Sequence, residues 1–254
     1  MIRRVRIAFA AAAFFCAPTF SFAAEVKVMA GAALTGVIGE LGPKFERATG
    51  HKLVIQYGLS GTFKKQIEAG ELVDLAIFGL AQVDDLIKQG KISVETRVEL
   101  CRVGIGVAVR AGAPKRDINS VNAFKATLVN AKSIAYVPDG ASGAHLAKVL
   151  EGLGIADQMK TKAKPQQVAE RVAQAVADGE AELGVAPIPV ILSVGGAELA
   201  GLLPEELQNY LVLTAGIASG AKEPEAAKAL LTFLMTPEAT AVMKAKGMER
   251  VTPK

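Results

Sequence analysis

The sequence has few of the side chains that carry metal or redox chemistry. Its 254 residues include two cysteines, two histidines and no tryptophan. Cys16 and Cys101 do not form a CxxC pair, and His51 and His145 lack the spacing of paired metal ligands. We therefore expect no metal centre, no dithiol redox site and no cofactor.

Common active-site motifs are also missing. Gly58-Leu-Ser-Gly-Thr62 has threonine where a nucleophile elbow needs its second glycine. Gly104-Ile-Gly106 lacks the third glycine of a dinucleotide fingerprint, and the sequence contains neither a P-loop nor an HExxH motif. Asp74 and Asp139 have no partner for acid–base work, and a carboxylate in an anion site would repel its ligand. These absences predict that the chain is not an enzyme.

One long apolar run stands at the N-terminus. Three arginines within the first six residues precede an uncharged stretch at residues 7–17, and Ser21-Phe22-Ala23 offers a small-x-small cleavage site. The stretch is too short to cross a bilayer, which needs about 20 apolar residues, so a retained anchor is the weaker alternative. We expect residues 1–23 to be a cleavable signal peptide and the mature chain to be periplasmic.

Removal of this segment would change the charge and the thiol content. The 29 Lys and Arg residues exceed the 25 Asp and Glu residues, but three of the arginines lie in the expected signal peptide. The mature chain is then close to neutral, and it has no basic cluster with interleaved aromatics, so nucleic acid is not an expected partner. Cys101 would remain without a disulfide partner, and its apolar strand pattern predicts a buried, unreactive thiol.

Strand and helix patterns alternate along the mature chain. The first block has strands at 26–29, 52–57 and 74–78 and helices at 34–48, 61–69 and 82–89. A longer strand at 102–109 precedes a second block, with helices at 121–130, 144–152 and 168–178 and strands at 134–137 and 183–186. A strand at 210–218 and helices at 224–234 and 237–246 complete the chain. This alternation predicts an α/β fold with parallel strands.

The two longer strands flank the second block. If the C-terminal helices pack back on the first block, the second block is inserted between two crossings of the chain. We then expect two lobes, each with a parallel-rich sheet covered by helices on both faces, joined by a two-strand hinge. Residues 24–105 and 216–254 would form lobe 1, and residues 106–215 would form lobe 2.

Three turns rich in small residues each follow a strand and precede a helix, at residues 30–35, 58–62 and 139–143. Ligands of open α/β sheets bind outside the carboxyl ends of strands. Small residues there let backbone N–H groups approach a ligand, and the helix N-terminus adds partial positive charge. The turns therefore predict an anion site that needs no Lys or Arg. The alternative is that Ser60 and Ser142 are ordinary helix N-caps.

Five segments of the chain form a recognisable set. They are Val28-Met-Ala-Gly-Ala-Ala-Leu-Thr35, Gly58-Leu-Ser-Gly-Thr-Phe-Lys-Lys-Gln-Ile-Glu-Ala-Gly70, Val73-Asp-Leu-Ala-Ile-Phe78, Leu183-Gly-Val-Ala-Pro187 and the C-terminal run from Ala226 to Ala239. This set resembles the periplasmic molybdate-binding protein family, and the likeness extends over essentially the whole mature chain. The resemblance implies a periplasmic-binding-protein-like fold with ligand capture between two lobes. It also implies a monomer that delivers its ligand to an ABC permease in the inner membrane.

The resemblance also implies a set of ligand contacts. These are Ala33, Ser60, Gly61, Leu80, Ser142, Gly143 and Pro187. Ser60 matches a family serine, whereas Ala33 stands where the family typically has serine and Pro187 where it often has tyrosine. The ligand therefore stays open between a molybdate- or tungstate-like oxyanion and a small organic acid with an apolar part. His145, one turn into its helix, either reaches the cleft or is a partly exposed helix residue.

The sequence is compatible with three classes of function. The favoured one is the solute-binding component of an ABC importer for a small anion. A ligand-sensing module on the same fold, without transport, is the second, and the sequence does not separate it from the first. An enzyme on a related two-lobed fold is the third, and the missing catalytic motifs speak against it.

Overall fold

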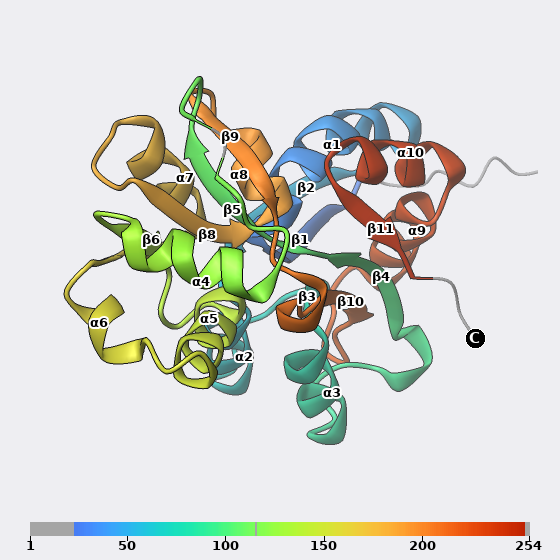
Figure 1. Ribbon diagram of the computed structural model, residues 1–254. Helices are drawn as coiled ribbons and strands as arrows, with labels where there is room; N and C mark the ends of the chain where they lie inside the picture. The colour runs from blue at the N-terminus through green and yellow to red at the C-terminus, as the bar shows by residue number, and fades with distance from the viewer. Residues whose placement is uncertain (1–22, 115, 252–254) are drawn as a thin grey trace, which may run out of the picture.

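The computed structural model describes residues 23–114 and 116–251, which form two β-sheets with helices on both faces (Figure 1). The predicted signal peptide, Ala23 apart, lies outside the described residues. Within the described ranges, no helix is both long enough and apolar enough to span a membrane.

The first sheet has the strand order β11-β4-β10-β3-β1-β2. Its strands are β1 (Glu25–Gly31), β2 (Lys52–Gly58), β3 (Leu75–Gly79), β4 (Val98–Val103), β10 (Leu211–Ile217) and β11 (Met248–Arg250). One face is covered by α1 (Thr35–Thr49), α9 (Pro224–Leu234) and α10 (Pro237–Ala245), and the other by α2 (Ser60–Glu68) and α3 (Leu80–Lys88) (Figure 1). We call this unit lobe 1.

The second sheet has the order β7-β6-β8-β5-β9 and defines lobe 2. Its strands are β5 (Ile105–Arg110), β6 (Ile134–Tyr136), β7 (Ala163–Pro165), β8 (Leu183–Pro187) and β9 (Ala197–Leu202). The helices α4 (Val121–Asn130), α5 (Ala141–Gly152) and α6 (Ala156–Lys160) pack on one face, and α7 (Ala169–Ala177) and α8 (Ile188–Ser193) on the other. Three short 3₁₀ turns are η1 (Ala32–Leu34), η2 (Val94–Thr96) and η3 (Glu205–Leu207).

Apolar side chains on both faces of each sheet form a core on each side of that sheet. In β3, Leu75 and Ile77 join the core beneath α1, whereas Ala76 and Phe78 join the core beneath α2 and α3. Successive side chains of a strand point to opposite faces, so a strand buried on both faces is apolar throughout, as β3 is. Because β1 pairs in parallel with both β2 and β3, the carboxyl ends of all three strands lie at one edge of the sheet.

The two-lobed α/β fold is confirmed, but its strand pairing is more mixed than the alternation predicts. In lobe 1, β1 runs parallel to β2 and β3, whereas β10 is antiparallel to β3 and β4. In lobe 2, β6 is parallel to β7 and β8, and β5 is antiparallel to β8 and β9. The strands that follow the interlobe crossings are β5 and β10. Each runs antiparallel to both of its neighbours in its sheet.

The strand predicted at 102–109 is in fact two strands in different sheets. Gly104 separates β4 from β5, and a Cβ there would lie 2.8 Å from Leu202 Cδ2, so a side chain at this position would require Leu202 to move. The chain returns to lobe 1 between Leu202 and Leu211. All of β10 pairs within the first sheet, so residues 211–215, which the sequence assigned to lobe 2, sit in lobe 1's sheet. The division of the whole chain into lobes otherwise stays a prediction.

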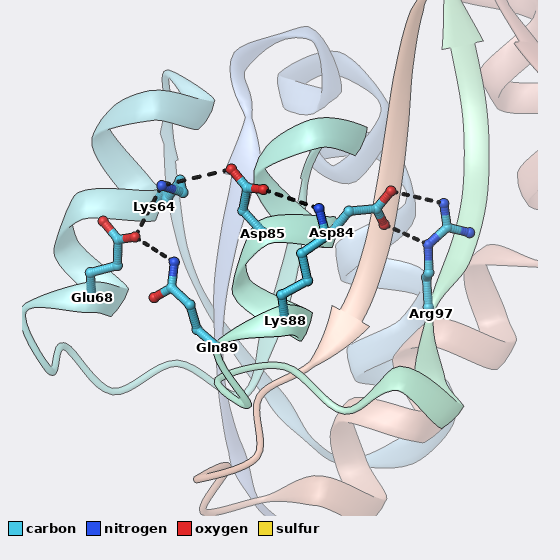
Figure 2. Close-up of polar contacts among 7 residues, drawn as sticks. All are labelled: Lys64, Glu68, Asp84, Asp85, Lys88, Gln89 and Arg97. Carbon is cyan, nitrogen blue, oxygen red and sulfur yellow. Dashed lines mark hydrogen bonds and ion pairs between the residues drawn. The ribbon is translucent and has the colours of Figure 1, made fainter.

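Polar contacts connect α2 to α3 on the surface of lobe 1 (Figure 2). Lys64 Nζ lies 3.0 Å from Glu68 Oε1 and 3.8 Å from Asp85 Oδ2, and Gln89 donates to Glu68 Oε1 at 2.7 Å. Partly exposed ion pairs of this kind contribute little free energy, but they restrict side-chain geometry. The contacts of Lys64 with Asp85 and of Gln89 with Glu68 therefore connect the later turns of the two helices.

Candidate functional site

A pocket of about 80 Å³ lies between the two lobes. Lobe 1 contributes Gly31, Ala32, Ala33, Gly58, Leu59, Ser60, Gly79, Leu211 and Leu213. Lobe 2 contributes Val137, Gly140, Ala141, Ser142, Ala169, Val172, Val185, Ala186 and Pro187. Apart from Leu211 and Leu213, which begin β10, most of these residues come from the carboxyl ends of strands and the first turns of helices, where open α/β sheets bind ligands.

Helix N-termini from both lobes face this pocket. In lobe 1, η1 and α2 start at Ala32 and Ser60, and in lobe 2, α5 and α7 start at Ala141 and Ala169. The first N–H groups of a helix have no acceptor within the helix, and together they carry partial positive charge. Helix N-termini arranged in this way can attract an anion through backbone groups.

Ser60 is held so that its hydroxyl proton is free. It is the first residue of α2, the N-cap is Leu59, and no side chain caps this helix. Ser60 Oγ instead accepts a hydrogen bond from the backbone N–H of Gly79 at 3.0 Å. Because the oxygen already accepts, the hydroxyl can donate to an acceptor in the pocket.

Ser142 is even more available to a ligand. It is the second residue of α5, only 6% exposed, and no side chain caps that helix either. No hydrogen bond to its side chain is found among the described residues, although it lines the pocket. Its oxygen is open to the pocket, so water or a ligand oxygen there can pair with the hydroxyl. The alternative that Ser60 and Ser142 are N-caps is wrong for both.

No side chain with a formal charge is present among the described residues that line the pocket. A carboxylate does lie beside it, because Glu170 Oε1 in the first turn of α7 is 3.4 Å from Thr35 Oγ1 of α1. Thr35 Oγ1 also donates to Ala32 O at 2.8 Å. These contacts join the lobes next to Ala32 and Ala169, which line the pocket.

One wall offers no hydrogen-bond donor. Pro187 lines the pocket and, like Pro189, has no backbone N–H. The N–H of Ile188 between them donates to Gly104 O at 3.0 Å. This wall therefore presents hydrocarbon to a ligand, and it is bonded directly to the crossing between β4 and β5.

The structure brings some of the expected ligand residues into the pocket lining. Ala33, Ser60, Ser142 and Pro187 line it, whereas Gly61, Leu80 and Gly143 each stand one position after a lining residue. A Cβ at Gly143 would lie 1.9 Å from Val137 O, so glycine is required for the close packing of α5 against that turn. The assignment of all seven as ligand contacts remains a proposal.

Two other polar residues have structural contacts. His145 does not line the pocket, and its Nε2 lies 2.7 Å from Leu207 O. Asp74, 3% exposed, accepts backbone N–H groups at its two carboxylate oxygens: from Lys27 at 2.8 Å, from Lys222 at 2.7 Å and from Glu223 at 3.0 Å. Asp74 thus ties β1 and β3 to the start of α9.

The buried thiol is confirmed, and no metal cluster is found. Cys101 is fully buried, and burial raises the pKa of its thiol to about 12. Across residues 23–114 and 116–251, no three His, Cys, Asp or Glu side chains gather closely enough to hold a metal ion.

Part of the pocket was not foreseen from the sequence. Ala169 and Val172 of α7 and Leu211 and Leu213 of β10 also line it. Their spacing is that of ordinary core positions, since apolar residues facing a cleft repeat with the same period as those facing a core. The small-residue turns were visible, but the apolar walls were not.

The chain is similar to bacterial solute-binding proteins and to one protein named as an enzyme. The profile of a family described as bacterial extracellular solute-binding protein matches residues 26–249. An aconitate isomerase from Pseudomonas sp. is 34% identical over 230 residues, covering 88% of this chain and 87% of that protein. The molybdate-binding protein ModA of Azotobacter vinelandii is 29% identical over 261 residues, covering 97% of each. A solved periplasmic molybdate-binding protein from Azotobacter vinelandii matches with a TM-score of 0.77 at 22% identity, covering 90% of this chain and all of that one.

The first of these relatives corrects an expectation. The missing catalytic motifs predicted that the chain is not an enzyme, yet a protein 34% identical to it over most of its length is named as an isomerase. The prediction was wrong to take absent motifs as evidence against catalysis, because motifs describe only the active sites from which they were defined.

Proposed function

Because the chain belongs to the family of bacterial extracellular solute-binding proteins, we propose that it is exported to the periplasm and captures a small anion between its lobes for an ABC importer. The observation that carries this proposal is the interlobe pocket, which combines helix N-termini from both lobes with the unpaired hydroxyl of Ser142. Such a site binds anions without a cationic side chain.

Capture would involve both lobes. Ser60 and Ser142 would donate their hydroxyl protons, and first-turn N–H groups near Ala33, Gly61 and Gly143 would complete the shell, with Leu80 behind Gly79. Solute-binding proteins close by bending at a few residues between lobes. Here the crossing at Gly104 would bend, and the closed form would be presented to the permease.

Two classes of anion are supported by relatives. The relatives named as molybdate-binding proteins support a molybdate- or tungstate-like oxyanion. The relative named aconitate isomerase supports a small organic acid. Both would meet helix N-termini with negatively charged oxygens, so the class of function does not depend on which is right.

The same relative supports a second candidate function, isomerisation of a bound organic acid. Incubation of the purified protein with trans-aconitate, followed by chromatography of the acids, would test it. Catalytic formation of cis-aconitate, many turnovers per protein molecule, would establish the activity. A product amount that does not exceed that of a heat-denatured sample would remove this candidate.

The capture function is tested by a thermal-shift screen with molybdate, tungstate, sulfate, phosphate, succinate and trans-aconitate, and with glucose as a neutral control. A ligand at 100 times its dissociation constant stabilises a protein by about 2.7 kcal/mol, an easily detected shift. A shift with at least one anion is expected, and a shift with glucose alone, or with none, would contradict the proposal. Loss of uptake of the identified anion in a deletion strain would then distinguish transport from sensing.

A further inference from the structure

A second cavity, of about 410 Å³, lies in lobe 2 away from the interlobe pocket. Arg110 ends β5, and Lys132 and Glu182 come just before β6 and β8, so all three stand at the edge of the sheet where β6 and β8 begin. The interlobe pocket instead takes Val137 and Pro187 from the edge where these strands end. Because a strand rises about 3.3 Å per residue, the backbone from Glu182 to Pro187 separates the two sites by about 16 Å.

Three cationic side chains line this lobe 2 cavity, with a single carboxylate among the described residues of its lining. The cations are Arg110, Arg116 and Lys132, and the carboxylate is Glu182. Three positive charges and one negative charge give the described lining a net charge of +2. Like charges brought together from separate segments repel one another, and an anion between them removes that repulsion.

The carboxylate is already engaged within the protein. Glu182 Oε1 accepts a hydrogen bond from Arg116 Nη2, and Glu182 Oε2 accepts one from the backbone N–H of Lys132 at 2.7 Å. No hydrogen bond or ion pair of the Arg110 guanidinium or of the Lys132 ammonium group is found among the described residues. Two positive charges are therefore available to a ligand.

A hydroxyl and a glycine complete the polar side of the lobe 2 cavity. Ser133 Oγ accepts from Glu182 N at 3.0 Å, so its hydroxyl proton is free to donate to a ligand. Gly179 follows α7 with a φ of +79°, and a Cβ there would lie 3.6 Å from Arg110 Nη1. The guanidinium thus lies close to this turn, and its paired N–H groups suit two oxygens of one anionic group.

The charge and the size of the cavity together indicate a class of ligand. A phosphate monoester carries a charge of about −1.5 to −2 at neutral pH and three acceptor oxygens, whereas a carboxylate carries one charge on two oxygens. The monoester is therefore the better match for a lining with a net charge of +2. A volume of about 410 Å³ lies in the range of about 300–1,000 Å³ that is typical of sites for organic molecules, and Val109 and Val176 add apolar surface.

From these contacts we infer that the lobe 2 cavity binds the phosphate group of an organic phosphate monoester, with Arg110, Lys132 and Ser133 as its donors. This site is separate from the interlobe pocket and does not depend on which anion is captured there. Helix α7 lines both, with Val172 at the interlobe pocket and Val176 at the lobe 2 cavity. A ligand in the lobe 2 cavity therefore contacts a helix that also forms a wall of the capture site.

Titration calorimetry on the purified, dialysed protein tests the inference. Glycerol 2-phosphate is the probe, and glycerate, with a carboxylate on a three-carbon skeleton, is its control. Arg110→Gln and Lys132→Gln should each weaken binding of glycerol 2-phosphate about tenfold, in line with the loss of a hydrogen bond to a charged group. Neither should reduce the unfolding free energy, because neither side chain has a partner in the described chain. Lys148→Gln removes the same charge from an exposed residue of α5 outside both linings and should leave the affinity unchanged.

Ser142→Ala distinguishes the two sites. It alters the interlobe pocket alone, so it should leave the affinity for glycerol 2-phosphate unchanged. Loss of that binding in Ser142→Ala, with full binding in Arg110→Gln, would place the ester in the interlobe pocket and overturn the inference. Equal affinity for glycerate would overturn the preference for phosphate.

Co-sedimentation with phosphatidic acid vesicles, with phosphatidylcholine vesicles as the control, distinguishes a lipid phosphate from a soluble ester. Sedimentation that is lost in Arg110→Gln, without heat from glycerol 2-phosphate, would support the site and assign it to a lipid headgroup. Heat from glycerol 2-phosphate without sedimentation would assign it to a soluble ester. Neither heat nor sedimentation would overturn the inference and leave anion capture between the lobes standing.

Discussion

The side-chain amide of Gln208 is hydrogen-bonded to both backbone groups of Ile105. Its Oε1 accepts from Ile105 N at 3.0 Å, and its Nε2 donates to Ile105 O at 3.0 Å. Ile105 opens β5 just after the chain enters lobe 2, and Gln208 precedes β10, which returns to lobe 1. The Gln208 side chain thus connects the segment that leads back to lobe 1 with the segment that enters lobe 2.

The two bonds are not equivalent. Ile105 O also accepts from Leu203 N at 3.1 Å, whereas Gln208 Oε1 is the acceptor that the structure gives the fully buried N–H of Ile105. Gln208→Ala should therefore reduce the free energy of unfolding by about 1–3 kcal/mol, the cost of an unsatisfied buried donor. Urea denaturation measures the loss, and an unfolding free energy equal to that of the unsubstituted protein would contradict the prediction.

The two pocket serines should respond differently to removal of the hydroxyl. Ser142→Ala breaks no bond within the described protein, so it should weaken anion binding about tenfold and leave stability unchanged. Ser60→Ala also removes the acceptor of Gly79 N, so it should in addition lower the unfolding free energy by about 1 kcal/mol. Calorimetric titration and urea denaturation of both variants separate the effects. A clear stability loss for Ser142→Ala would show that its hydroxyl has an internal partner.

Two glycines of α5 form a matched pair. A Cβ at Gly143 would lie 1.9 Å from Val137 O, so Gly143→Ala must displace the first turn of α5 and should cost more than about 2 kcal/mol of unfolding free energy. A Cβ at Gly152 meets no atom within 4 Å, so Gly152→Ala should be neutral or stabilising by up to about 1 kcal/mol. Chemical denaturation of both variants checks the contrast, which equal effects would refute.

The Cys101 thiol predicts a dependence of stability on alkaline pH. Burial raises its pKa to about 12 in the folded protein, from an ordinary value of 9.0. Above about pH 9 the unfolded chain releases this proton and the folded protein retains it, so stability falls as pH rises from 9 towards 12. Cys101→Ala should show a shallower fall between pH 8 and pH 10.5 in urea denaturation. Parallel curves for the two proteins would contradict the prediction.

Some elements could be predicted to the residue because local signals define their ends. The helix at 121–130 was expected and is α4, whose N-cap Ser120 accepts a hydrogen bond from Ala123 N. The helix at 224–234 was expected and is α9, with Pro224 in its first turn, where a missing N–H costs nothing. In both cases the chemistry that starts the helix lies within a few residues.

Other elements depend on contacts that local sequence does not contain. The short strands β7, β9 and β11 were missed because each is defined by pairing with a distant partner. The helix α8 was also missed, although Pro189 stands in its first turn, where proline is tolerated. The break at Gly104 was hidden within a continuous apolar pattern.

The candidate site was predicted in part for the same reason. The small-residue turns around Ser60 and Ser142 are local features, and both lie at the pocket. Which apolar side chains complete it depends on how the two lobes face each other. No periodicity distinguishes Val172 or Leu213, which line the pocket, from residues that fill a core.

The absence of charged side chains from the described pocket lining has a consequence for where the protein can work. Recognition by hydroxyls and backbone amides keeps the same strength across mildly acidic and neutral surroundings, because these groups do not titrate there. The pH profile of capture is then set by the ligand's own acid dissociation. A ligand that is a weak acid would lose affinity as it becomes protonated, while the hydroxyl and amide donors of the pocket would stay unchanged.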